Sequence, residues 1–191
     1  MNNDSRNEAQ RLLEEAMAVD AQGDADRCAQ LLRESIALQP VNPFAHYLLG
    51  ADLVVRGQHG DAVLHMTTAM EQAPQLWEAR LQLGLLWLTL DNLQTAATVA
   101  QPLTALPDTT AMHHFGAALT LIATGQVGLA SAALRHGLAI GSDNVPLMGD
   151  MRTLLQRLEQ AQQSASQESD LQVMQLGMAI SAYAGSEPTD R

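Results

Sequence analysis

The chain has 191 residues, a formal net charge of -11 and only 3% aromatic side chains. All ten basic residues are arginine. Such an acidic chain is a poor partner for nucleic acid or for an anionic membrane surface, because both attract clustered basic side chains. The single cysteine, Cys28, excludes an internal disulfide and a cysteine-rich metal site, and we expect it to be a buried core thiol.

The N-terminal segment is polar and contains no apolar stretch of the kind found in secretory signals. Residues 1–8 are therefore expected to form a flexible N-terminus. The longest apolar run, from Leu81 to Leu90, has about ten residues and is too short to span a bilayer. We expect a cytoplasmic protein without membrane insertion, and the exclusive use of arginine favours a bacterial source.

Four consecutive stretches share one register of 34 residues. The second stretch states the pattern most fully, with Gly50, Gly57, Ala62, Met66, Ala69 and Pro74. Equivalent series of small and apolar residues begin at Ala16, Gly84 and Ala118. The register predicts four units, over residues 9–42, 43–76, 77–110 and 111–144, each with two helices because the apolar positions recur at helical spacing.

In chain order, the first unit is predicted to hold a helix over 8–21 and a second helix that Asp24 caps and that ends near Leu38. Pro40 and Pro43 bracket the turn into the second unit, whose helices are expected over 43–56 and 60–72. The turn between these two helices contains Gly57.

The third unit contains the least polar stretch of the chain, LQLGLLWLTL, within a helix expected over 76–90. Asp91 and Asp108 are the only charged residues between Arg80 and Arg135. A helix that is apolar on all sides must be covered on all sides. The cover is either a binding partner, because large apolar patches mark interaction sites, or deeper packing against a neighbouring or terminal helix.

Beyond the four units, residues 145–163 are predicted to form a helix with an apolar stripe. Arg152 stands where Gly50 stands in the second unit, so a further helix is obstructed and residues 145–163 are expected to cap the array. The polar stretch 164–169 is predicted to be a linker, 170–184 an amphipathic C-terminal helix, and 185–191 a disordered tail.

The repeated residues resemble the tetratricopeptide repeat (TPR), whose signature is W-x2-L-G-x2-Y, A-x3-F and P. The second unit matches it as His46-x2-Leu49-Gly50-x2-Leu53, Ala62-x3-Met66 and Pro74. The resemblance covers about residues 9–144. It implies an all-α, right-handed α-solenoid of four two-helix repeats with a C-terminal capping helix.

In this family the first helix of each unit lines a concave groove. The resemblance therefore implies a peptide-binding groove formed by Phe44, Tyr47, Ala51, Val54, Leu81, Leu85, Leu88, Met112, Phe115, Leu119 and Ile122. The chain lacks the Lys, Asn and Arg clamp with which some members hold the acidic C-termini of chaperones. A mainly apolar groove favours an extended apolar peptide or one face of an amphipathic helix.

These features predict a scaffold or adaptor that binds a protein or peptide partner. Several alternatives stay open. In the first, the chain's own residues 171–183 fill the groove, either in cis or from a second copy in a homodimer held by residues 170–184. In the second, the chain is an acidic secretion-type chaperone for exported proteins; its size and charge fit this alternative, but its four-unit build does not. A self-assembling structural protein is a further alternative.

No sequence pattern predicts catalysis, a cofactor or a metal site. Nucleophile motifs, phosphate-binding loops and dinucleotide fingerprints are absent. His113 and His114 are adjacent, so on a helix their side chains point about 100° apart. The sequence has no H-E-x-x-H motif of the kind that forms a zinc-binding helix. His46 and His114 occupy the tryptophan position of the repeat signature, where we expect them to pack between helices.

Overall fold

The computed structural model describes the backbone of residues 3–184 and the side chains of residues 3–167. Every regular element in this part of the chain is helical. The elements are α1 (Asn3–Asp20), α2 (Ala25–Leu38), α3 (Pro43–Val55), α4 (His59–Gln72), α5 (Trp77–Thr89), α6 (Leu93–Ala100), the 3-10 helix η1 (Gln101–Ala105), α7 (Ala111–Ala123), α8 (Val127–Ile140) and α9 (Val145–Ala184).

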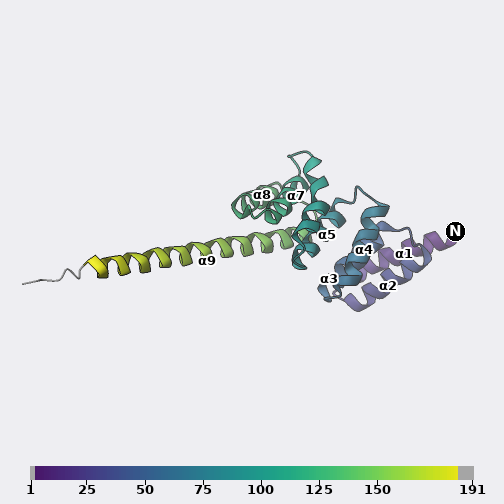
Figure 1. The fold of residues 1–191 in the computed structure, drawn as a ribbon. Helices are drawn as coiled ribbons and strands as arrows, with labels where there is room; N and C mark the ends of the chain where they lie inside the picture. The colour runs from purple at the N-terminus through teal and green to yellow at the C-terminus, as the bar shows by residue number, and fades with distance from the viewer. Residues whose placement is uncertain (1–2, 185–191) are drawn as a thin grey trace, which may run out of the picture.

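The helices pack as successive pairs, α1 with α2, α3 with α4, α5 with α6, and α7 with α8. Neighbouring pairs stack on one another, and α9 follows the last pair (Figure 1). This arrangement confirms the predicted all-α solenoid of four two-helix repeats with a C-terminal capping helix.

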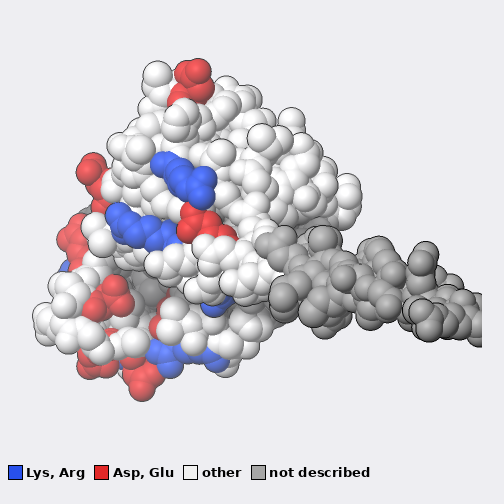
Figure 2. Space-filling view, turned by 90° about the vertical axis from the view of Figure 1, so that its left-hand side faces the viewer, with Lys and Arg blue, Asp and Glu red and all other residues white. Residues whose placement is uncertain are grey.

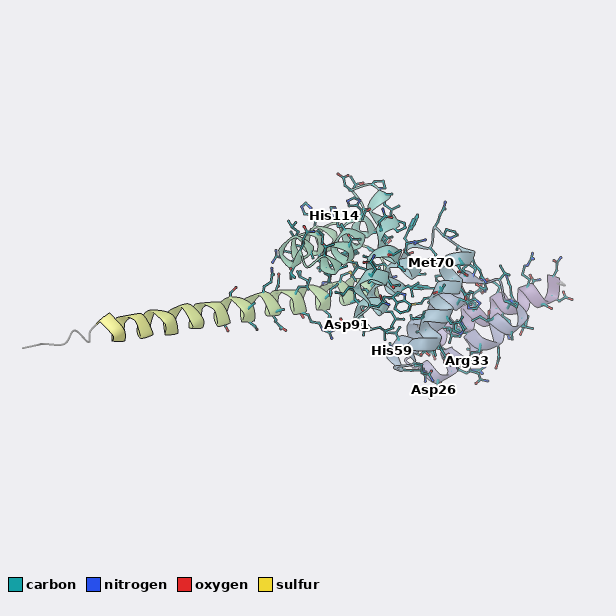
Figure 3. All side chains as sticks on the ribbon, in the orientation of Figure 1. Asp26, Arg33, His59, Met70, Asp91 and His114 are labelled. Carbon is teal, nitrogen blue, oxygen red and sulfur yellow. The ribbon has the colours of Figure 1, made fainter. Side chains whose placement is uncertain are left out.

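The turn inside each pair contains one residue with positive φ, and these residues recur every 34 positions: Gly23, Gly57, Asp91 and Gly125, at 84°, 72°, 57° and 72° respectively. A left-handed residue lets the first helix stop and the second reverse direction. Figure 3 shows Asp26, His59 and Asp91, which lie in or soon after these turns, along one edge of the molecule. The 34-residue repeat of the sequence therefore reappears in the structure as the spacing of the turns within the helix pairs.

Side-chain caps begin several of the helices. Each cap residue accepts a hydrogen bond from the backbone N–H three residues later, which satisfies a donor that the helix itself leaves unpaired. The capping side chains are Asp24, Asn42, Asn92, Thr110 and Asn144. The predicted cap at Asp24 is confirmed, with 3.1 Å between Asp24 Oδ1 and Arg27 N.

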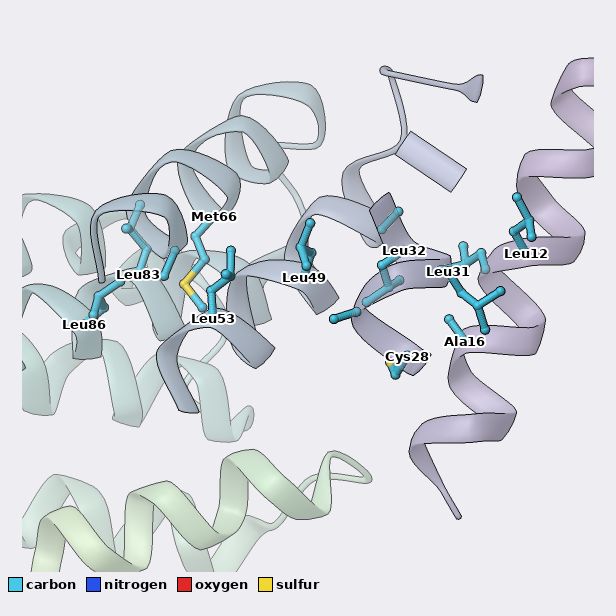
Figure 4. Packing of buried hydrophobic residues seen from close by; sticks show 14 residues of the cluster. Leu12, Ala16, Cys28, Leu31, Leu32, Leu49, Leu53, Met66, Leu83 and Leu86 are labelled. Carbon is cyan, nitrogen blue, oxygen red and sulfur yellow. The ribbon is translucent and has the colours of Figure 1, made fainter. Parts of the chain in front are cut away.

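A continuous apolar core runs from α1 to α5, and Figure 4 shows its buried leucines, with Met66 at the level of α4. The small residue of the repeat pattern lets the paired helices approach. A Cβ atom on Gly50 would lie 2.7 Å from Met66 Cγ and 3.3 Å from Met66 N. A larger side chain at this position would displace Met66 or push α3 and α4 apart, because the first contact is closer than packed atoms allow and the second is tight.

The third unit departs from the regular pattern. Helix α6 stops at Ala100, and the chain continues as the 3-10 helix η1 through Pro102, which lacks the N–H that an α-helix needs. Leu103 stands where the second unit has Ala69, and it is fully buried. Gly116 of α7 makes room for it, since a Cβ on Gly116 would overlap the Leu103 Cβ.

Helix α9 begins as the first helix of a fifth unit, but within the described residues it continues as one helix to Ala184 and does not turn into a second one. Leu147 and Met151 are fully buried against the fourth unit, while Arg152 is exposed where a second helix would pack. Contacts with α8 continue to the ion pair of Arg135 with Glu159 at 2.6 Å and to Gln162, which accepts from Ser131 Oγ at 3.4 Å. Beyond this point α9 extends away from the repeats (Figure 1).

Some helices begin or end at other residues than the sequence predicts. Residues 164–169 are not a linker, because α9 is one helix of 40 residues from Val145 to Ala184. The segment contains neither Pro nor Gly, and the Ser166 hydroxyl donates to the Gln162 carbonyl within the helix at 2.9 Å. Helix α1 starts at Asn3, earlier than expected. Residues 1–2 and the predicted tail at 185–191 lie outside the described residues.

Substitution of Asp91 by Gly is expected to raise the free energy of unfolding by about 1 kcal/mol, because a left-handed conformation is costly for a residue with a Cβ. The matched change Gly57→Asp is expected to lower it by a similar amount. Urea unfolding followed by circular dichroism measures both. If both changes shifted the free energy of unfolding in the same direction, this account of the turn would be contradicted.

Substitution of Gly116 by Ala is expected to lower the free energy of unfolding by about 1–3 kcal/mol, because the added methyl group collides with Leu103. Gly149→Ala in α9 is the control. A Cβ on Gly149 meets no atom within 4 Å, so this change is expected to raise stability by about 0.5–1 kcal/mol through the helix preference of alanine. Thermal or urea unfolding compares the two, and a stabilising Gly116→Ala would refute the proposed contact.

Candidate functional site

Helices α1, α2, α3 and α5 and the start of α9 line an open groove with a volume of about 680 Å³. We call it the open groove. It is lined by Met17, Asp20, Ala25, Cys28, Phe44, Tyr47, Leu48, Ala51, Asp52, Val55, Leu76, Glu78, Gln82, Asn144 and Pro146. A volume of this order holds several side chains of a ligand.

Large apolar side chains face solvent in this groove. Met17 is 48% exposed, Phe44 37% and Val55 87%. The ring of Phe44 lies beside that of Tyr47, with 6.0 Å between the ring centroids. These side chains come from α1 and α3, so they form one apolar strip across two units. Exposed apolar side chains gathered in a concavity are typical of a surface that binds another apolar surface.

The loop before α9 closes one side of the open groove. Asn144 Nδ2 donates to the Tyr47 hydroxyl at 3.4 Å, and Asn144 Oδ1 accepts from Leu147 N at 3.1 Å as the cap of α9. One side chain therefore starts the helix and ties it to the second unit. Burial raises the pKa of the Tyr47 phenol above its ordinary value, and the nearby charges of Glu78 and Asp150 raise it further.

Three carboxylates lie in the open groove, on Asp20, Asp52 and Glu78. Arg56 Nε pairs with Asp52 at 2.7 Å, and its Nη1 pairs with Asp26 at 2.6 Å. Asp20 and Glu78 form no ion pair with any residue that the structure describes. The groove therefore combines an apolar strip with uncompensated negative charge.

A smaller hollow of about 320 Å³ lies between α5 and α9. Gln82 lines both this second hollow and the open groove, and its Nε2 lies 3.5 Å from Asp150 Oδ2. Burial raises the pKa of the Asp150 carboxyl above its ordinary value. The start of α9 thus divides the concave face into two parts.

Comparison with known proteins supports the fold independently of the sequence pattern. TTC0263, a thermophilic TPR protein of Thermus thermophilus, aligns with a TM-score of 0.64 at 20% identity over 81% of this chain and 82% of that one. MamA 41-end from Desulfovibrio magneticus RS-1 aligns with a TM-score of 0.58 at 16% identity, covering 88% and 97%. YrrB, a TPR protein with an unusual peptide-binding site, aligns with a TM-score of 0.56 at 16% identity, covering 73% and 70%.

The chain has a tetratricopeptide-repeat fold. No protein-family model and no curated protein matches its sequence. At 16–20% identity the solved TPR structures establish the architecture, whereas function depends on the site that each protein builds on the fold.

The TPR fold brings together only part of the residues predicted for the groove. Phe44, Tyr47 and Ala51 line the open groove. Val54, Leu85 and Leu88 line the second hollow on the other side of Gln82. The predicted single apolar channel is therefore two separate depressions.

The remaining predicted groove residues line neither depression. Leu81, Phe115 and Leu119 are fully buried, in one core cluster with Leu147 and Met151 of α9. Met112 and Ile122 are half-buried against the same cluster. In the third and fourth units, the sequence left open whether a partner or a terminal helix covers the apolar side chains. The structure shows that α9 covers the three fully buried ones.

The chain's own C-terminal helix does not fill the open groove in cis. Residues 170–184 continue α9 in the direction that leads away from the repeats (Figure 1). Along a helix that rises about 1.5 Å per residue, Leu171 lies about 38 Å beyond Pro146, which lines the groove. An uninterrupted helix cannot bend back over this distance.

The family resemblance places Asp20 and Glu78 among the positions that line the groove, and both residues do line it. It did not indicate Asn144. Asn144 carries no such signal, because it reaches Tyr47 across 97 residues of sequence. Figure 2 shows charged side chains over the lower part of the molecule, where the N-terminal helices lie, and few charges above them.

Two histidines form a hydrogen-bonded pair that the sequence did not indicate. His46 Nε2 donates to the Pro40 carbonyl at 3.1 Å, so in a neutral ring its Nδ1 is an acceptor. His65 Nδ1 donates to this atom at 2.8 Å. The pair joins α3 to α4, and His46 is buried between helices as expected. Among the described residues, no group of three or more His, Cys, Asp or Glu side chains is arranged to hold a metal ion.

The structure gives one further negative result. Within the described part of the chain, no helix combines the length and hydrophobicity that crossing a membrane requires.

Stability is expected to fall as pH falls below about 6.5. Burial, followed by the neighbouring His46, lowers the pKa of His65 below its ordinary value of 6.5. The unfolded chain therefore binds the proton at higher pH than the folded chain, which favours unfolding between the ordinary pKa and the lowered one.

Two measurements check this expectation. Nuclear magnetic resonance titration of the His65 ring is expected to give a midpoint below 6.5. Urea unfolding at about pH 7.5 and about pH 5.5, on either side of the ordinary histidine pKa, is expected to show a smaller loss of stability in His65→Gln than in the unsubstituted protein. A midpoint at or above the ordinary value would contradict the effect of burial.

Proposed function

We propose that this chain is a protein-interaction module whose open groove binds a short apolar or amphipathic segment of a partner protein. The observation that carries the proposal is the strip of exposed apolar side chains in a concavity of about 680 Å³, with Val55 87% exposed. Soluble proteins rarely leave such a strip open unless it binds something.

The energetics are compatible with reversible binding. Burial of a large apolar side chain contributes about 1.5–3 kcal/mol, so four or five partner side chains contribute roughly 6–15 kcal/mol. Association costs about 4–15 kcal/mol. Affinity near the micromolar range follows if the partner segment is already ordered, and this is the range of a reversible adaptor.

The known TPR structures add limited support. One of these proteins, YrrB, has an unusual peptide-binding site. In the present chain the same fold presents a groove of suitable size. The second hollow, at about 320 Å³, is the smaller of the two, so we assign the primary binding surface to the open groove.

A selection from a random peptide library on the full chain tests the proposal. We expect enriched peptides to bind with dissociation constants near the micromolar range. Binding is expected to weaken by about tenfold or more in Val55→Ser, because one deeply contacted apolar side chain is lost. Val55 is largely exposed, so this substitution leaves the core intact.

Val41→Ser is the matched control, because Val41 is 66% exposed and does not line the groove. It is expected to leave affinity unchanged. Failure to enrich any peptide, or equal loss in the two variants, would reject the open groove as the binding surface.

A further inference from the structure

The charges in the open groove narrow the kind of partner that it fits. Asp20 is the last residue of α1, whereas Glu78 is the second residue of α5. The first helices of successive repeats run in the same direction in this fold, so the two carboxylates lie near opposite ends of the groove. The apolar strip of Met17, Phe44 and Val55 lines the same groove.

Neither end carboxylate is neutralised by the protein itself. Asp20 and Glu78 have no ion pair among the described residues. Arg56 is already paired with Asp52 and Asp26. A ligand that brings its own carboxylates would add repulsion, whereas a basic ligand would supply the missing countercharge.

Two groups within the groove sense this negative charge. Burial raises the pKa of the Cys28 thiol, and the charges of Asp20 and Asp52 raise it further. At the other end, burial raises the pKa of Tyr47, the hydrogen bond with Asn144 lowers it, and the charge of Glu78 raises it. In both groups burial is the largest cause, and the nearby carboxylates act in the same direction as burial.

Resting on the function proposed above, we infer that the open groove binds a segment of another protein with an apolar centre and an arginine or lysine on each side. From Phe44 to Val55 the strip spans about 11 helical steps of α3, or about 16 Å. The two basic residues of the partner segment therefore lie beyond the two ends of its apolar centre. Apolar contact supplies affinity, and the two end charges supply direction and selectivity.

The same charges argue against the chain itself as the occupant. Residues 168–191 contain Glu168, Asp170, Glu187 and Asp190 but one basic residue, Arg191. A second copy that placed this segment in the groove would set carboxylates against Asp20 and Glu78. The partner is therefore a different, basic chain.

Three helical peptides of about four turns test the inference. They share leucines at i, i+3, i+4 and i+7 spacing and differ only in the residues that flank this stripe at each end, which are arginine, glutamine or glutamate. Titration calorimetry with the full chain at low salt is expected to rank the arginine peptide tightest and the glutamate peptide weakest. Added salt is expected to reduce the difference, because it screens exposed charges.

The double variant Asp20→Asn, Glu78→Gln is expected to weaken the arginine peptide by about 3- to 20-fold, as two exposed ion pairs are lost. The glutamine peptide is expected to bind it as before. The control is Asp61→Asn, Glu71→Gln, which removes two exposed carboxylates of α4 outside the groove. It is expected to leave all three affinities unchanged and so to exclude general attraction to an acidic protein.

The outcomes separate the inference from the function on which it rests. If the glutamine peptide binds and loses affinity in Val55→Ser while the arginine peptide binds no tighter, the groove function stands and the basic partner is wrong. Equal weakening by the groove and control double variants also overturns the inference. If none of the peptides binds and the library selection enriches none, both proposals fail.

Discussion

The packing of α9 onto the concave wall of the third and fourth repeats determines which surface of the stack stays open. Leu147 and Met151 are fully buried in one cluster with Leu81 and Phe115. Burial of a large apolar side chain contributes about 1.5–3 kcal/mol, so these contacts hold the start of α9 on the stack. This helix covers Leu81 in the least polar stretch of the chain and leaves the N-terminal groove uncovered.

The same helix connects the two halves of the structure. Asn144 caps α9 and also donates to Tyr47 in the second repeat. Helix α9 and its cap residue therefore both cover the third and fourth repeats and form one side of the open groove. The apolar strip that α9 leaves accessible lies in the same groove as Asp20 and Glu78, so its surroundings are negatively charged.

Local residue patterns were sufficient to predict the repeats, because each unit is built from short-range rules. The 34-residue spacing of the left-handed turns, the close contact at Gly50 and the cap at Asp24 each depend on residues near in sequence or one helix away. The polar stretch 164–169 was misjudged because a solvated helix and a linker have similar composition. The contact of Leu103 with Gly116 was likewise not predicted, because it depends on the 3-10 helix that contains Pro102.

The candidate site was predicted in part. Phe44, Tyr47 and Ala51 follow from the resemblance to the TPR family, in which the first helix of each unit lines the inner face. The burial of Leu81, Phe115 and Leu119 does not follow from it, because α9 is distant in sequence and its path depends on how the whole stack curves. Sequence by itself determined the helices, their turns and their pairing, which are local; tertiary structure decided which inner face is covered, because that depends on contacts between distant segments.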